Sequence, residues 1–387
     1  MGLKYLYVPS GYKAGTAYGV LPNAANADFA FVRGSAATRV NADGLIQSEI
    51  TNVPRLDYTD GTCPTLLTEP ASTNLLHNSG WEGGGALPTD WSYGNSGGTS
   101  TPVISTRGTI IKAYRFQTSS ARHSFNRNTT SVSGTTYTLS VYVESITGSS
   151  QFNSILYRIG GGGTDIFKKD GVVVSSTEGV VAGSFYSITF TSNTVQTIEF
   201  RVGLGVVGDV TGDVTISQPQ LETLAYRTSF MISAIGAIAT RSADTGVISG
   251  DLSSYINSSE GVLEIKAKAL FNGGNDCRIT LSDGTNDNRV GLIWFSSPNN
   301  TSVIVQKDAT TVVNPNLNID QTLMTTFKIK WKSGDIQVKV NGTVVFTDTS
   351  TFSELILDQL SFSKGTETNF FQGNVQYIKV YDSVTDF

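Results

Sequence analysis

Apolar and polar residues alternate with a period of two along much of this chain, and this pattern restricts what it can fold into. In residues 137–143 and 198–204, aromatic and aliphatic residues alternate mainly with polar ones, and in residues 327–332 Phe, Ile and Trp alternate with three lysines. A period of two places one set of side chains on a core face and the other in water, as in antiparallel sheets. No window shows an amphipathic helix of three turns. We therefore predict an all-β fold.

Turn-forming residues support the same fold class. The chain has 40 glycines, and only 15% of its residues are charged. Asn341-Gly342 separates two alternating runs at 336–340 and 343–347. Because Asn and Gly tolerate the positive φ of a type I′ turn, this sequence predicts a tight hairpin.

Charge and cysteine content exclude several classes of protein. The net charge is −5 with no block of Lys or Arg, which argues against nucleic acid as a partner. Cys63 and Cys277 are far apart, so neither a disulfide framework nor a zinc site is expected. Residues 1–15 lack the apolar run of a secretory signal, and the most apolar window, 230–239, is too short to span a bilayer. We expect folding in a reducing cytoplasm and no membrane insertion.

The 387 residues are too many for one ordinary domain. Changes in composition predict an irregular, strand-containing N-terminal module at 1–77, a β-sandwich module at 78–222, a connector at 223–245 and a second β-sandwich module at 246–387.

One long motif carries a resemblance to a known group of proteins. It reads Phe-Val-Arg-Gly-Ser-Ala-Ala-Thr-Arg-Val-Asn-Ala-Asp-Gly-Leu-Ile at 31–46, Asn-Val-Pro-Arg-Leu-Asp-Tyr-Thr at 52–59 and Leu-Leu-Thr-Glu-Pro-Ala-Ser-Thr-Asn-Leu-Leu at 66–76. This run resembles the N-terminal anchoring module of tailed-bacteriophage virion proteins of the head-fibre and tail-fibre type. The resemblance implies a structural and binding protein of a virus particle.

Two looser resemblances concern the sandwich modules. Residues 78–222, with Trp81-Glu82, Trp91 and the closing Gln220-Leu221-Glu222, are similar to jelly-roll carbohydrate-binding modules. Residues 246–387 look like a concanavalin A-like or laminin-G-like sandwich, judged by the runs at 260–265, 289–292 and 371–375. The first family often holds a structural calcium ion, which by resemblance would have Glu82 and Glu222 as ligands; no other cofactor is expected.

Candidate catalytic residues are few. A glycosidase needs two facing carboxylates, but Glu264 has no second carboxylate two positions away, since Ile265, Lys266 and Ala267 follow it, and alternation predicts that Glu264 faces solvent. The two histidines, His77 and His123, are not accompanied by a Gly-x-Ser-x-Gly nucleophile elbow. We therefore predict that the chain is not an enzyme.

Sugar binding would need aromatic rings that are free to stack on a pyranose. Trp294 and Phe295 are adjacent, so one of them should face away from the core. We take both as glycan-binding candidates, together with Tyr93 and Tyr114. Burial in the core is the alternative for each of these rings.

The N-terminal motif also has a structural interpretation. Its arginines lie among acidic residues, which suits a network of paired charges at a subunit or module interface. The candidates for this assembly interface are Arg33, Arg39, Arg55, Asp57 and Glu69.

Together these features favour a bacteriophage virion protein, made in the host cytoplasm and displayed on the particle as a head fibre, capsid decoration or tail fibre. Its expected partners are other virion proteins of the capsid or tail and glycans of the host surface. Resemblance implies a homo-oligomer, with a trimer common among such fibres. The first alternative is a purely structural assembly protein that joins other virion components. The second alternative is a glycan depolymerase.

Overall fold

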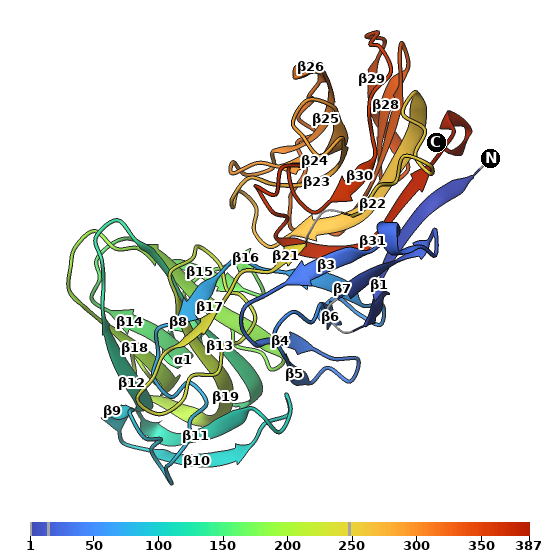
Figure 1. Cartoon of the computed structure of the whole chain (residues 1–387). Coiled ribbons are helices and arrows are strands. Elements are labelled where there is room, and N and C mark those ends of the chain that lie inside the picture. Colours follow the sequence, from blue (N-terminus) through green and yellow to red (C-terminus); the bar gives the residue numbers. More distant parts are fainter. Residues whose placement is uncertain (1, 14–15, 247–248) are drawn as a thin grey trace. The chain divides into compact units, whose positions relative to one another are not determined.

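The computed structural model describes residues 2–13, 16–246 and 249–387, and nearly all of its regular structure is β-strand (Figure 1). The all-β prediction is confirmed. The chain divides into two compact units. Unit 1 comprises Met1–Asp43, Glu49–Pro70 and Ser242–Phe387, and unit 2 comprises Gly44–Ser48 and Ala71–Arg241. Unit 2 is therefore almost entirely an insertion in the sequence of unit 1.

The larger sheet of unit 1 has 11 strands within the described residues. In sheet order these are β21 (Thr245–Gly246), β3 (Phe29–Val32), β2 (Thr16–Leu21), β1 (Leu3–Lys13), β31 (Gly373–Tyr381), β22 (Glu260–Ala269), β27 (Thr325–Lys332), β28 (Ile336–Val340) and β29 (Thr343–Asp348), while β7 (Thr65–Thr68) joins β31 to β6 (Arg55–Asp57). Asn341-Gly342 forms the β28–β29 turn, and both residues have positive φ, as the hairpin prediction requires.

A five-stranded sheet faces it across a shared core. Its order is β26 (Thr310–Val313), β25 (Thr301–Lys307), β24 (Arg289–Trp294), β23 (Cys277–Ser282) and β30 (Gln359–Ser361). Phe327, Ile329 and Trp331 of β27 point into this core, where Phe327 packs edge-on against Trp294 at 6.2 Å between ring centroids. Unit 1 is thus a β-sandwich.

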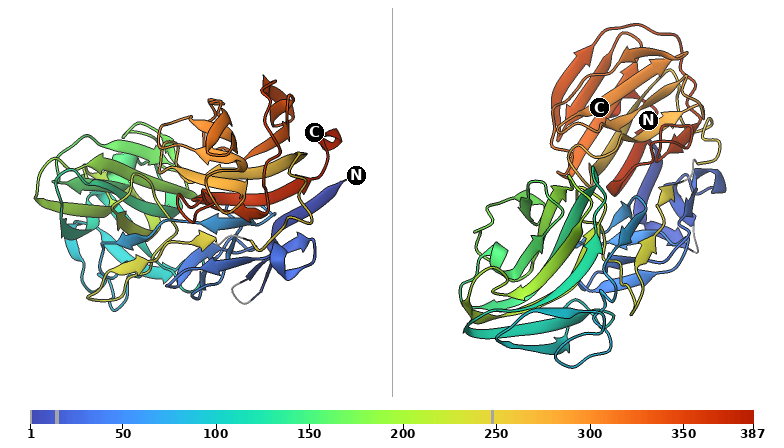
Figure 2. Two further views of the ribbon diagram at one scale, coloured as in Figure 1. Left: turned by 45° about the horizontal axis from the view of Figure 1, so that its top comes forward. Right: turned by 90° about the vertical axis from the view of Figure 1, so that its left-hand side faces the viewer.

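Unit 2 is a second sandwich. Its seven-stranded sheet has the order β10 (Thr99–Ile104), β11 (Lys112–Ala121), β19 (Val210–Glu222), β13 (Thr136–Thr147), β17 (Ser184–Thr191), β15 (Ile166–Lys169) and β16 (Val172–Val173). Its four-stranded sheet has the order β14 (Leu156–Ile159), β18 (Thr197–Leu204), β12 (His123–Thr130) and β9 (Ser92–Ser96), and Figure 2 shows the strands from two further directions. Phe116 and Phe125 meet between the two sheets with ring centroids 4.7 Å apart.

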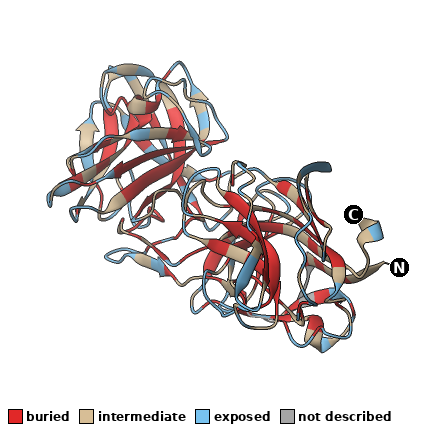
Figure 3. Cartoon of the chain, turned by 90° about the horizontal axis from the view of Figure 1, so that it is seen from above, coloured by how far each residue is buried: buried red, intermediate tan, exposed pale blue. Residues whose placement is uncertain are grey.

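Short elements complete the chain. They are β4 (Ala37–Val40), β5 (Ile46–Glu49), the antiparallel pair β8 (Ser72–Asn74) and β20 (Ala239–Arg241), the single-turn helix α1 (Phe152–Ile155) and the 3-10 helices η1 (Ala25–Ala27) and η2 (Val384–Asp386). In each unit the buried residues follow the central strands, as the alternation predicts (Figure 3).

The N-terminal segment differs from the predicted separate module at 1–77. Strand β1 pairs with β31, so Leu3 lies opposite Tyr381, and β7 also pairs with β31. Strands β1, β2, β3, β6 and β7 of the N-terminal segment therefore complete the larger sheet of the C-terminal sandwich. Alternation within a segment cannot reveal this, because it shows which face is buried but not which distant strand will be the neighbour.

Candidate functional site

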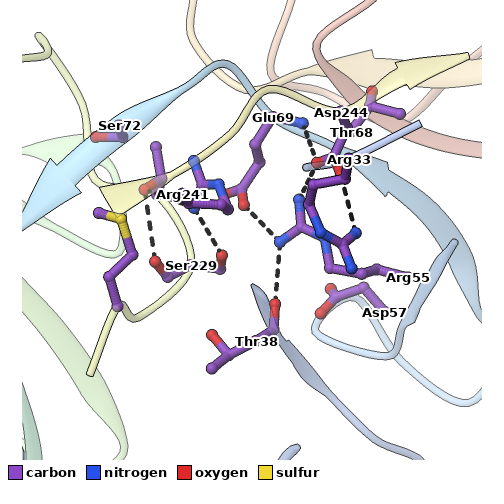
Figure 4. A network of polar contacts seen from close by, with 12 residues as sticks. Arg33, Thr38, Arg55, Asp57, Thr68, Glu69, Ser72, Ser229, Arg241 and Asp244 are labelled. Carbon is purple, nitrogen blue, oxygen red and sulfur yellow. Dashed lines mark hydrogen bonds and ion pairs between the residues drawn. The ribbon is translucent and has the colours of Figure 1, made fainter. Parts of the chain in front are cut away.

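The arginines of the N-terminal motif do form a network of paired charges, and it lies inside unit 1 (Figure 4). Arg33 donates from Nη1 to Asp244 Oδ1 at 3.0 Å. Arg55 donates from Nη1 to Glu69 Oε2 at 2.6 Å and from Nη2 to Asp244 Oδ2. Burial alone would lower the pKa of Arg55, but the charges of Asp244 and Glu69 outweigh it and raise that pKa.

The network is fully buried within unit 1, so of the predicted subunit or module interface, the exposed subunit interface does not fit these side chains. The side chains of Arg33, Arg55, Glu69 and Asp244 are almost inaccessible to water. Asp57 is buried too, and it accepts hydrogen bonds from backbone N–H groups, Val40 N among them. In the folded chain these side chains have no free surface to offer a partner.

Arg39 is the remaining member of the predicted set. Its Nε donates to Glu49 Oε1 at 2.6 Å and its Nη1 to the Leu56 carbonyl at 2.9 Å. Both side chains of the pair keep a small exposed fraction. A role for Arg39 in assembly stays a prediction.

Unit 2 has its own polar cluster beside its first and last strands. Strand β8 pairs with β20, with Ser72 opposite Arg241, and Arg241 Nη1 donates to Ser229 Oγ at 2.9 Å (Figure 4). Glu222 is buried at the end of β19 and accepts hydrogen bonds from Ser72, Gln220 and Thr228.

The predicted calcium ligands do not fit a shared site. Both oxygens of Glu222 are already occupied by hydrogen-bond donors, whereas Glu82 is exposed and pairs with Lys112. In the described part of the chain, no group of three or more His, Cys, Asp or Glu side chains is arranged to hold a metal ion.

Two of the four predicted sugar platforms are buried. Trp294 is 1% exposed and packs against Phe327 and Phe371, and Tyr114 is 0% exposed in the core of unit 2. Neither ring can stack on a sugar while the sandwiches are folded, so the burial alternative holds for both. The cause is strand register, which turns these rings inward.

Phe295 and Tyr93 remain accessible. Phe295 is partly exposed next to the buried Trp294, as alternation predicts for adjacent residues. Tyr93 is 40% exposed and lies 5.3 Å from His123 between ring centroids. Glycan binding by Phe295 or Tyr93 stays a prediction.

Glu264 does not face bulk solvent, contrary to the prediction from alternation. It is 5% exposed, and its Oε1 accepts a hydrogen bond from Tyr377 at 2.8 Å. Lys328 and Lys379 on the two neighbouring strands lie 3.2 and 3.6 Å from its oxygens. Burial would raise the pKa of Glu264, but the hydrogen bonds from Tyr377 and Lys328 and the lysine charges outweigh it and lower that pKa.

The feature that sequence reasoning missed is a group of cations on the outer face of the five-stranded sheet. Arg278 lies on β23, Arg289 begins β24, and Lys364 follows β30. Arg289 is 6% exposed, yet its guanidinium is held by the amide oxygens of Gln306 and Asn286. Alternation does place Arg278 and Arg289 outward, but only the strand register shows that they share one face.

Comparisons with known proteins show no family. No family model matches the chain, and no curated protein matches it. Among solved structures, the crystal structure of the adhesin domain of Epf from Streptococcus pyogenes matches with 10% identity and a TM-score of 0.17, covering 75% of this chain and 99% of that one. A likeness this weak supports no argument about this chain. In the described residues, no helix has the length and apolarity needed to cross a membrane.

Proposed function

We propose that this chain is a structural protein of a tailed-bacteriophage particle, displayed as a head fibre, capsid decoration or tail fibre, and that it contacts glycans of the host surface. The N-terminal motif at 31–76 supports the virion assignment by resemblance. The observation that favours binding over bond cleavage is the way the buried carboxylates are used.

Each of these carboxylates is committed to partners within its own unit. Asp244 and Glu69 hold arginines, Glu222 accepts from serine, threonine and glutamine, and Glu264 lies between two lysines. A glycosidase needs two carboxyl groups that face each other across roughly 5 to 10 Å with room for the sugar between them. Buried carboxylates that are held by donors of their own unit stabilise the fold and do not face a space that a sugar could occupy. We therefore favour a role without catalysis.

The test compares binding with cleavage on the same material. Purified full-length protein is added to a panel of host-surface polysaccharides, and retention on each polysaccharide and release of new reducing ends are both measured. Retention without new reducing ends is expected. New reducing ends would support the depolymerase, and no retention on any polysaccharide would support the assembly role.

The assembly alternative has one observation in its favour. Strand β29 is at the edge of the large sheet, and its Val344 and Val345 are exposed. An edge strand with apolar side chains is a template for pairing with another chain. Light scattering of the purified protein tests self-pairing at this edge: a trimer or other oligomer that is lost when Val345 is replaced by Lys would support pairing at β29, and a monomer would exclude pairing between copies of this chain.

A further inference from the structure

The outer face of the five-stranded sheet in unit 1 brings two arginines onto one side. In the β23–β24 register, Arg278 lies opposite Ile293, Thr280 opposite Gly291 and Ser282 opposite Arg289. The intervening residues of β23 are buried in the sandwich core. Because side chains alternate along a strand, Arg278 and Arg289 project from the same outer face, with Thr280 and the bare Gly291 between them.

Lys364 joins this face from the neighbouring strand. Strand β30 pairs with β23, with Ser361 opposite Thr280, and Thr280 Oγ1 donates to the Ser363 carbonyl at 2.8 Å. Lys364 therefore begins beside Thr280, between the two arginines along the strand. Burial and the charges of Arg278 and Arg289 lower the pKa of Lys364, so the three cations are close enough to repel one another.

This cluster lacks the carboxylates that other buried arginines of the unit have. Within the described residues, no ion pair involves Arg278, Arg289 or Lys364, and Nε of Arg278 is buried without a hydrogen-bond partner. Arg289 makes its hydrogen bonds, at 2.6 to 3.1 Å, to neutral amide oxygens. Burial and the charge of Arg278 lower the pKa of Arg289 to about 10. Asp276, two positions before Arg278 in the chain, is the acid whose charge reaches that arginine.

Buried charge without a counter-charge costs folding free energy, so it calls for an anion from outside. The opposite sheet shows the contrast, because there Lys328 and Lys379 are paired with Glu264. Arg278 and Lys364 are partly exposed and can reach a ligand, while the buried Arg289 contributes positive charge beneath them. A guanidinium suits a planar carboxylate or a phosphate, because it can donate two parallel hydrogen bonds.

We infer that Arg278 and Lys364, supported by Arg289, bind the anionic groups of an acidic polysaccharide. This inference rests on the proposed function, since it names the class of glycan that the chain would contact. Two classes of polymer carry such groups, and both repeat an oxyanion along a sugar or polyol chain. The oxyanion is a carboxylate in uronic-acid polymers and a phosphate in teichoic-acid-like polymers.

The experiment measures binding of the full-length protein to three immobilised polymers: polygalacturonate, poly(glycerol phosphate) and neutral dextran. Arg278→Gln, Lys364→Gln and their double variant are compared with Lys266→Gln, which makes the same charge change on β22 of the opposite sheet. We expect about tenfold weaker binding to the preferred acidic polymer for each single variant and about a hundredfold for the double variant, because charge-assisted hydrogen bonds are lost. Lys266→Gln should stay within about twofold. The better of the two acidic polymers identifies the anion.

A second readout separates the two proposals. Inorganic phosphate is added to the wild type and to the double variant, and the melting temperature is recorded. Phosphate should stabilise the wild type alone. If it does so while no polymer is bound, the anion site is supported and the glycan function is not. Equal binding of an acidic polymer by the wild type and the double variant would overturn the site but leave glycan binding intact, and binding of dextran alone would overturn the acidic class.

Discussion

Glu69 and Asp244 are bonded to each other in unit 1, although 175 positions separate them in the sequence. Asp244 N donates to the Glu69 carbonyl at 2.9 Å, and Glu69 N donates to Asp244 Oδ2 at 2.8 Å. Glu69 lies just before the chain enters unit 2, and Asp244 lies just after it returns. These two hydrogen bonds therefore hold together the points where the chain leaves unit 1 and returns to it. The Asp244 carboxylate also neutralises both Arg33 and Arg55.

Replacing Asp244 by Ala should destabilise unit 1 severely. It removes the shared counter-charge of Arg33 and Arg55, and breaking a buried ion pair from one side costs about 3–5 kcal/mol. The free energy of unfolding from urea titration measures the loss. Asp209→Ala is the matched control, since it breaks the exposed pair with Arg122 and should cost less than about 1 kcal/mol. Equal losses for the two variants would contradict a structural role for the network.

Glu264 should make unit 1 depend on pH in the acid range. Its pKa is lowered in the folded state, so its contribution is fully present above the ordinary Glu pKa of about 4.3 and is lost as pH falls through the folded value. Glu264→Gln should cost about 1–3 kcal/mol at neutral pH, and this cost should be smaller near pH 3, below the ordinary Glu pKa. Urea unfolding at the two pH values measures this.

The control for Glu264 is Glu260→Gln on the same strand. Glu260 pairs with Lys332, and both side chains are more exposed than that of Glu264. Its substitution should change stability by less than about 1 kcal/mol at either pH. A cost for Glu264→Gln that persists unchanged near pH 3 would show that packing, and not charge, explains its effect.

His123 should make unit 2 sensitive to mild acid. The ring is buried among Tyr93, Phe116 and Phe125, and neither of its nitrogens has a hydrogen-bond partner within the described residues. Burial lowers the pKa of His123, so the unfolded chain takes up the proton first. Stability should therefore fall as pH drops below about 6.5, by up to about 1.4 kcal/mol per pH unit.

His123→Phe should remove this slope, because a phenyl ring suits an aromatic cluster and does not titrate. Hydrogen exchange of β12 and β18 amides between pH 7 and pH 5 reports on unit 2 alone. His77→Gln is the control and should retain the slope of the wild type. Retention of the full slope in His123→Phe would assign the acid sensitivity to another group.

Alternation was enough to predict the fold class, the inward rings of β27 and the β28–β29 hairpin, because these depend on neighbours in the sequence. It failed where distant strands meet. Glu264 alternates as a solvent-facing residue should, yet the lysines and tyrosines of the adjacent strands bury it. Alternation cannot say which face of a strand the rest of the chain covers, and for this reason it leaves the buried rings of Trp294 and Tyr114 as candidates for glycan binding. The Arg278–Arg289–Lys364 cluster likewise depends on the register of three strands.

The four glycines at 160–163 provide a test of backbone geometry in unit 2. All four have positive φ, and a Cβ on Gly163 would lie 2.1 Å from the Thr191 carbonyl oxygen. Gly171 also has positive φ, but a Cβ there would meet nothing within 4 Å. Gly171→Ala should cost about 1–2 kcal/mol from conformation alone. Gly163→Ala should cost about 1–3 kcal/mol more, because the backbone must also move. Thermal unfolding of the two variants should therefore differ, and similar melting temperatures would argue against the close approach.

Lys364→Gln should stabilise unit 1, in contrast to most substitutions of partly buried residues. Burial and the charges of Arg278 and Arg289 already disfavour the protonated Lys364, so an uncharged side chain removes a desolvation cost and relieves repulsion. The gain should be a few tenths of a kcal/mol to about 1 kcal/mol at low ionic strength, and it should shrink in about 1 M salt, where the Debye length is about 3 Å. Lys332→Gln should show no gain at either ionic strength, because it loses the pair with Glu260. Urea unfolding at both ionic strengths measures the difference. Loss of stability in Lys364→Gln at low salt would mean that the cluster holds the sheet together, and that its charge is not kept for a ligand.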